Sequence, residues 1–122
     1  MAKQIVIVDD DVDILEFMQL TLAYAGYDVR VSSTGKDIEQ LRPSDLPDLI
    51  LLDVMLAEED GRVICQHLKT NEQTKDVPII MLSAHVSVRQ LRQACPADDF
   101  LAKPFELETL LDKVEQQLPE HS

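Results

Sequence analysis

Five short apolar segments alternate with five stretches of helical periodicity along a chain of 122 residues. Residues 5–8, 49–52 and 77–82 are apolar at almost every position, which is typical of strands buried on both faces of a parallel sheet. Residues 27–31 are more polar, and residues 100–102 form a shorter segment. Strict alternation of strands and helices predicts an α/β fold: a doubly wound (βα)5 sheet with helices on both faces.

The segments between the expected strands carry apolar side chains at helical spacing. After the first strand this spacing runs from Val12 to Ala25, and Gly26 supplies the left-handed conformation that often ends a helix. The other helices are expected from Thr34 through Leu41, from Asp60 through Leu68, from Val88 to Cys95 and from Leu107 to Leu118. The carboxyl ends of the strands then meet at one edge, where such sheets bind ligands.

The charge balance restricts the partners of the chain. Eleven Lys and Arg residues stand against 23 Asp and Glu residues, for a formal net charge of −12. Nucleic acids and acidic membrane surfaces attract basic faces, so the sequence predicts no direct contact with either. No apolar run has the length of a membrane span, and the first residues show no signal-peptide pattern. We expect residues 1–122 to form one domain in the cytoplasm.

Charged residues gather where the expected strands end. Asp9 and Asp10 follow the first strand, Asp53 the third, Ser83 the fourth and Lys103 the fifth. Two unit charges 4 Å apart repel by about 4 kcal/mol at an effective dielectric constant near 20, so three neighbouring carboxylates need cations. Lys103 supplies one positive charge, and a divalent cation would supply two more. Because carboxylates and water suit Mg²⁺, the sequence predicts a magnesium site at this edge.

This edge lacks the glycine patterns of nucleotide-binding sheets. The chain has only three glycines, none of them in the first strand–helix turn. The aspartates would repel a bare phosphate, but Mg²⁺, Lys103 and the Ser83 hydroxyl together could clamp a phosphoryl group. Asp53 is then a candidate covalent acceptor, because carboxylates form aspartyl phosphates.

In these residues the chain resembles the response-regulator receiver domain of two-component signalling, over essentially its whole length. One matching segment alone is weak evidence, but all five occur in order and at matching spacing. They are IVIVDDD (residues 5–11), PDLILLD (47–53), DG (60–61), VPIIMLSA (77–84) and ADDFLAKPF (97–105). The resemblance implies a flavodoxin-like sheet of strand order 2-1-3-4-5. Because the chain starts with Met1 and shows no DNA-binding or catalytic domain after these segments, we expect a stand-alone, single-domain response regulator.

The resemblance assigns roles at the acidic edge. Asp53 would be the phosphoacceptor, and Lys103 would pair with the phosphoryl group. Mg²⁺ would be held by Asp9, Asp10, Asp53 and the backbone carbonyl of Met55. The phosphoryl group would come from a histidine kinase or a histidine phosphotransfer protein. The domain would catalyse only its own phosphorylation and dephosphorylation.

The resemblance also implies a switch. Ser83 would bond to the phosphoryl group, and Phe100 would be the aromatic residue that lies inward when Ser83 is drawn toward phosphate. The signal would pass to a downstream effector protein through the face of the fourth helix, fifth strand and fifth helix. The chain would act as a monomer or a weak homodimer. The Lys103–Pro104 peptide bond is expected to be cis.

Three departures from the family pattern have structural consequences. Ala57 stands where proline is usual, so the loop after Asp53 loses a restraint and is expected to be more mobile, or to bind a phosphoryl group more weakly. Only 20 positions separate Ser83 from Lys103, so the fourth helix or its leading loop must be shortened. Pro96 replaces the usual helix-ending glycine, so this helix must end by another geometry and the output face is expected to be atypical.

The sequence alone leaves two other functions open. A pseudo-receiver would bind partners without phosphorylation, although every residue that phosphorylation needs is present. A phosphohydrolase of the dehalogenase type would need a second aspartate two residues after its nucleophile, where Met55 stands.

Some polar residues have simpler explanations. Acids at a helix start, such as Asp11, Asp13 and Asp60, are typical of caps and of the helix dipole. The pair Asp98-Asp99 is typical of a solvated turn rather than of a site. His85 lies two residues after Ser83 and has a functional alternative: it could affect water access to a phosphate on Asp53. Two cysteines, Cys65 and Cys95, are expected to be buried thiols, with a regulatory disulfide as the alternative.

Overall fold

The sheet has the predicted parallel, doubly wound topology. The computed structural model describes residues 2–39, 41–57, 59–84 and 87–119. The strands are β1 (Gln4–Val8), β2 (Asp28–Ser32), β3 (Leu49–Asp53), β4 (Ile79–Ser83) and β5 (Asp99–Ala102). All pairings are parallel, and the strand order is β2-β1-β3-β4-β5. The predicted strand order is therefore confirmed.

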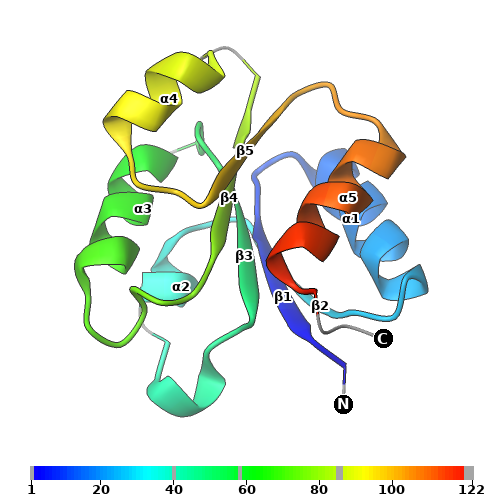
Figure 1. Cartoon of the computed structure of the whole chain (residues 1–122), viewed down its shortest axis with the longest axis horizontal. Helices are drawn as coiled ribbons and strands as arrows, with labels where there is room; N and C mark the ends of the chain where they lie inside the picture. Colours follow the sequence, from blue (N-terminus) through cyan, green and yellow to red (C-terminus); the bar gives the residue numbers. More distant parts are fainter. Residues whose placement is uncertain (1, 40, 58, 85–86, 120–122) are drawn as a thin grey trace.

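Helices cover both faces of the sheet. They are α1 (Val12–Tyr24), α2 (Lys36–Glu39), the 3-10 helix η1 (Pro43–Asp45), α3 (Gly61–Thr70), α4 (Val88–Ala94) and α5 (Leu107–Gln117). Figure 1 shows α1 and α5 on one face and α2, α3 and α4 on the other. The second helix is shorter than expected, and Pro43 opens η1, where its fixed φ suits a first helical position.

Two apolar cores hold these layers together. Side chains of β1, β3 and β4 point alternately to the two faces, and each face packs against its own set of helices. All five residues of β3 and of β4 are buried. This burial explains why the sequence shows uniformly apolar runs there. None of the described helices is long and apolar enough to cross a membrane.

The helix ends follow the predicted chemistry. The Asp11 carboxylate caps α1 by accepting hydrogen bonds from the backbone N–H groups of Asp13 and Ile14. Gly26 follows that helix with φ 101°, in the left-handed region. The Asp60 carboxylate caps α3 by accepting from the backbone of Arg62. The helix-cap interpretation of Asp11 and Asp60 is therefore confirmed.

Helix α4 is short and ends without a left-handed residue, as the departures predicted. Its last residue is Ala94, and Cys95 is already extended, with φ −150°. The side-chain amide of Gln66 in α3 donates to the Ala94 carbonyl at 2.6 Å, which satisfies a helix-end acceptor.

The two cysteines, Cys65 and Cys95, are free and buried. Burial, followed by the nearby Cys95 thiol, raises the pKa of Cys65 to about 12.

Candidate functional site

The sheet register brings two aspartates side by side. Val8 of β1 pairs with Leu52 of β3, so the next residues, Asp9 and Asp53, end neighbouring strands at the same edge. Both carboxylates are buried, Asp9 at 0% and Asp53 at 5% exposure. Buried carboxylates this close together require positive charge between them.

Lys103 supplies that charge. Its Nζ lies 2.7 Å from Oδ2 of Asp9 and 3.3 Å from Oδ2 of Asp53. The backbone N–H of Lys103 also donates to the Ser83 carbonyl at 2.7 Å, which fixes the start of the β5–α5 loop to the end of β4. The Lys103–Pro104 peptide bond is cis, as expected.

Burial and charge shift the titration of this cluster. Burial, followed by repulsion from the Asp9 carboxylate, raises the pKa of Asp53 to about 6, against the opposing effect of Lys103. Burial disfavours the charge on Lys103, but its bonds to Asp9 and its attraction to Asp53 outweigh burial and raise the pKa of Lys103. Asp53 is therefore mainly ionised at pH 7, and Lys103 stays charged.

Three carboxylates could hold a cation. Carboxylate oxygens of Asp9, Asp10 and Asp53 all lie within 4.8 Å of one another, and Asp10 is exposed to solvent. This donor set is hard oxygen with room for water, which suits Mg²⁺. Among the described residues it is the only group of this kind. The predicted ligands Asp9, Asp10 and Asp53 are therefore brought together.

The loop after Asp53 is folded tightly against the end of β3. Met55 forms an antiparallel bridge with Asp60, and the N–H of Gly61 donates to the Val54 carbonyl at 2.7 Å. A Cβ on Gly61 would collide with the carbonyl oxygen of Asp53. Glycine is thus needed here for close approach, a reason that the sequence alone did not reveal. The same loop keeps the backbone of Met55, the fourth expected ligand, beside Asp53.

Of the two expected switch residues, Ser83 lies at the same edge of the sheet as this cluster, and Phe100 lies within β5. Ser83 ends β4 and is buried, and it pairs with Ala102 of β5. Phe100 of β5 points inward with 6% exposure and packs in the core under α4. The guanidinium carbon of Arg92 lies 5.4 Å from the Phe100 ring centroid, a cation–π contact that the sequence analysis missed.

One sequence interpretation is wrong in part. Asp98 does lie at an exposed bend, but Asp99 is a partly buried residue of β5, and each of the two is ion-paired to a helix. Lys69 of α3 lies 2.6 Å from Oδ2 of Asp98, and Lys113 of α5 lies 3.1 Å from Oδ1 of Asp99. The proposed effect of His85 lies outside the described residues.

Comparisons with known proteins identify the family of this chain. A family model for the response regulator receiver domain matches residues 5–115. The chain is 40% identical over 113 residues to the DNA-binding dual master transcriptional regulator RpaA of Synechocystis sp., which covers 91% of this chain and 47% of RpaA. The chain spans about half the length of the curated relatives it matches.

Solved structures of receiver domains and response regulators have the same fold as this chain. A crystal structure from Chloroflexus aurantiacus matches with a TM-score of 0.89 and 34% identity, covering 98% of this chain and 100% of that one. The receiver domain of sensor histidine kinase PA1611 from Pseudomonas aeruginosa matches with a TM-score of 0.82 and 26% identity, covering 98% and 100%. That structure has a magnesium ion coordinated in its active-site cleft.

Proposed function

The chain belongs to the response regulator receiver domain family, and we propose that it works by accepting a phosphoryl group on Asp53 in a Mg²⁺-dependent reaction. The observation that carries this proposal is the Lys103 ammonium held between the two buried carboxylates of Asp9 and Asp53. In the proposed site the carboxylates of Asp9, Asp10 and Asp53 would hold Mg²⁺, together with the Met55 carbonyl. When bound, the ion neutralises charge on the phosphoryl oxygens.

The proposed reaction transfers phosphorus from a donor nitrogen to a carboxylate oxygen. An oxygen of Asp53 forms the new O–P bond while the N–P bond of a phosphohistidine breaks. The electron pair of that bond leaves with the imidazole, which takes up a proton from water. Lys103, 3.3 Å from Asp53, faces the negative charge that spreads over the phosphoryl oxygens.

Intact mass after incubation with a small phosphodonor and Mg²⁺ tests this function. We expect the wild type to gain one phosphoryl group, and Asp53→Ala or a chelator to abolish the gain. The control is Asp112→Ala, which removes an exposed acid of α5 and should label like the wild type. Equal labelling of Asp53→Ala would move the acceptor to another residue. No labelling of the wild type by a small donor or a phosphohistidine protein would favour a pseudo-receiver.

A histidine kinase or histidine phosphotransfer protein is the proposed donor. The site is bordered on one side by an apolar groove lined by Ile14, Phe17, Pro104 and Phe105, which begins at Lys103. Further apolar side chains that are exposed to solvent lie along α1 and at the start of α5: Leu20, Tyr24 and Leu107. A protein donor must cover the rim of the site to reach Asp53, so this apolar rim supports a protein rather than a small metabolite as the donor.

Phe17→Ala should separate the two kinds of donor. Phe17 is 44% exposed, so its truncation should slow transfer from a phosphorylated phosphotransfer protein by about 5-fold or more, by loss of contact area. Labelling by a small phosphodonor should keep its wild-type rate. Val63→Ala, at a residue of α3 that is 45% exposed, is the matched control and should change neither rate. Equal slowing with both donors would instead indicate damage to the site.

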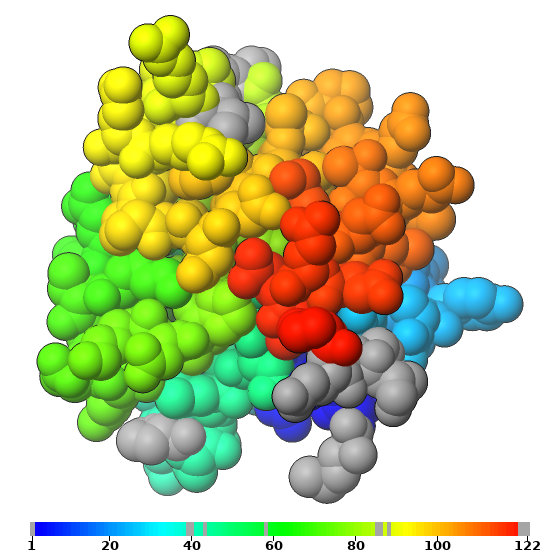
Figure 2. All heavy atoms as spheres, viewed as in Figure 1, coloured from blue at the N-terminus to red at the C-terminus, as the bar shows by residue number. Residues whose placement is uncertain are grey.

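The proposed output is the face formed by α4, β5 and α5. Figure 2 looks onto it, with α4 in yellow on one side and α5 in orange and red on the other. Phosphorylation would shift a two-state equilibrium through Ser83 and Phe100 and so change binding of an effector protein.

The proposed absence of nucleic-acid contacts applies only to this acidic domain, because the relative RpaA is a DNA-binding regulator about twice as long as this chain. A cytoplasmic location is part of the proposal.

A further inference from the structure

The loop after Asp53 is fastened to a second loop by one charged side chain. Oε1 of Glu59 accepts a hydrogen bond from the backbone N–H of Gly35 at 3.1 Å, across 24 residues of sequence. Gly35 is buried, and a Cβ on it would lie 3.0 Å from Oε2 of Glu59 and would collide with Ile64. The Glu59 carboxylate therefore sits against the main chain of the β2–α2 loop.

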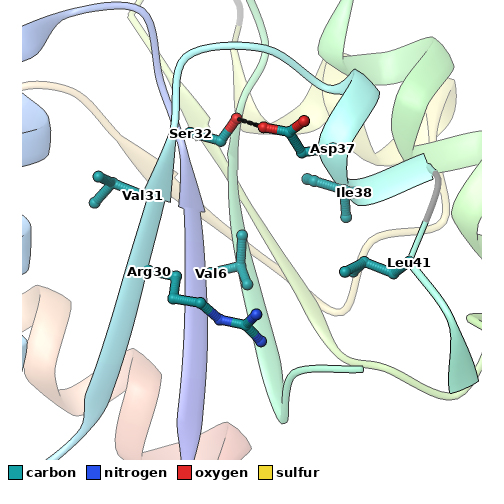
Figure 3. A pocket seen from close by; sticks show the side chains of 7 residues that line it. All are labelled: Val6, Arg30, Val31, Ser32, Asp37, Ile38 and Leu41. Atoms are coloured by element: carbon teal, nitrogen blue, oxygen red, sulfur yellow. Dashed lines mark hydrogen bonds between the residues drawn. The ribbon is translucent and has the colours of Figure 1, made fainter. Parts of the chain in front are cut away.

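The β2–α2 loop is in turn bonded to the start of the acidic edge. The backbone N–H of Asp9 donates to the carbonyl of Ser32, the last residue of β2, at 3.2 Å. Oγ of Ser32 lies 2.8 Å from the carbonyl oxygen of Thr34 and 3.1 Å from Oδ2 of Asp37. Figure 3 shows Ser32 and Asp37 joined at one end of the pocket between β2 and α2. These bonds hold the turn that presents the Gly35 N–H.

The other end of the link is bonded to the loop that carries Met55. The backbone carbonyl of Glu59 accepts from the N–H of Leu56 at 3.2 Å, and Met55 bridges to Asp60, the residue after Glu59. The Glu59 side chain thus connects a loop bonded to Asp9 with a loop that carries the Met55 carbonyl. Among the described residues, no other side chain forms a hydrogen bond between these two loops.

We propose that Glu59 is a positioning residue for the cation site, which rests on the function proposed above. Its bond to Gly35 sets the separation between Asp9 and Asp10 on one side and the Met55 carbonyl on the other. The loop after Asp53 lacks the family's usual proline at Ala57, and the Glu59 link replaces that local restraint with a tertiary one. Glu59 does not belong to the carboxylate cluster that could hold a cation, which among the described residues consists of Asp9, Asp10 and Asp53.

Mg²⁺ affinity of three variants tests the role of this bond. Each ¹⁵N-labelled protein is titrated with MgCl₂ at constant ionic strength, and the dissociation constant is read from the amide signals of Asp10 and Met55. Glu59→Ala should weaken Mg²⁺ binding by about 3- to 10-fold, the range expected for one lost hydrogen bond. Glu59→Gln keeps an oxygen acceptor for Gly35 and should stay within about twofold of the wild type. Glu72→Ala removes an exposed carboxylate beyond α3 and should change nothing.

The Gly35 amide gives a second readout that general destabilisation does not reproduce. The Gly35 amide signal should shift on addition of Mg²⁺ in the wild type and Glu59→Gln, but not in Glu59→Ala, while amides remote from the cation site and from the two loops stay unchanged. Wild-type affinity in Glu59→Ala would overturn the proposal. So would equal weakening in Glu59→Gln or Glu72→Ala, because charge rather than the bond would then act. Absence of Mg²⁺ binding in the wild type would overturn this proposal together with the proposed function.

Discussion

Replacing Lys103 by methionine is expected to lower the free energy of unfolding by about 3 kcal/mol at pH 7 without Mg²⁺. Methionine fills a similar volume but leaves Asp9, which is fully buried, and Asp53 without the ammonium that lies between them. Removing one partner of a buried ion pair is costly because the remaining charge has lost its hydration as well as its partner. Urea denaturation followed by circular dichroism measures the loss.

Two conditions should reduce this loss. Saturating Mg²⁺ should restore part of the stability of Lys103→Met, because a cation bound by the aspartates replaces the missing charge. Lowering the pH to 5 should also help, since the carboxylate of Asp53, whose pKa is raised to about 6, can then take up a proton. Lys113→Met is the matched control. It breaks the more exposed pair with Asp99 and should cost less than about 1 kcal/mol. Equal losses in both variants would contradict the assigned role of Lys103.

The parts of this molecule that the sequence predicted are those encoded by periodicity. A parallel strand ends at a fixed edge, so the positions of Asp9 and Asp53 follow once the apolar runs are identified. The strand order 2-1-3-4-5 and the roles of Ser83 and Phe100 came from resemblance to the family, because no local pattern encodes them. The structure confirms the strand order, and the roles stay predictions.

The contacts that the sequence did not predict join loops and helix ends. Glu59 binds the main chain at Gly35, and Gln66 binds the carbonyl of Ala94. A backbone partner has no side-chain identity, so nothing in the sequence marks it. The ion pairs of Asp98 and Asp99 were missed for a related reason: their partners, Lys69 and Lys113, come from helices that are distant in the sequence. Single-residue propensities carry no information on such pairs.

Asp53→Asn is expected to stabilise the Mg²⁺-free protein, by an amount that depends on pH. The pKa of this carboxyl is 3.8 in a model peptide and is raised to about 6 in the folded protein. Below pH 3.8 the group is protonated in both states, so the wild type loses nothing. As the pH rises from 3.8 to 6 the unfolded state releases its proton first, and the wild type loses stability over this window.

Asparagine does not titrate, so the variant should escape that loss. The free energy of unfolding of Asp53→Asn should exceed that of the wild type by about 3 kcal/mol at pH 7, and the difference should shrink toward zero near pH 4. Thermal unfolding from pH 4 to 7 measures it, with Asp112→Asn as the control for loss of one exposed acid from a chain of net charge −12. Added Mg²⁺ should narrow the gap at pH 7, because the cation stabilises the wild-type carboxylate. A gain that does not vary with pH would mean that asparagine stabilises through packing, and the raised pKa of Asp53 would not be its cause.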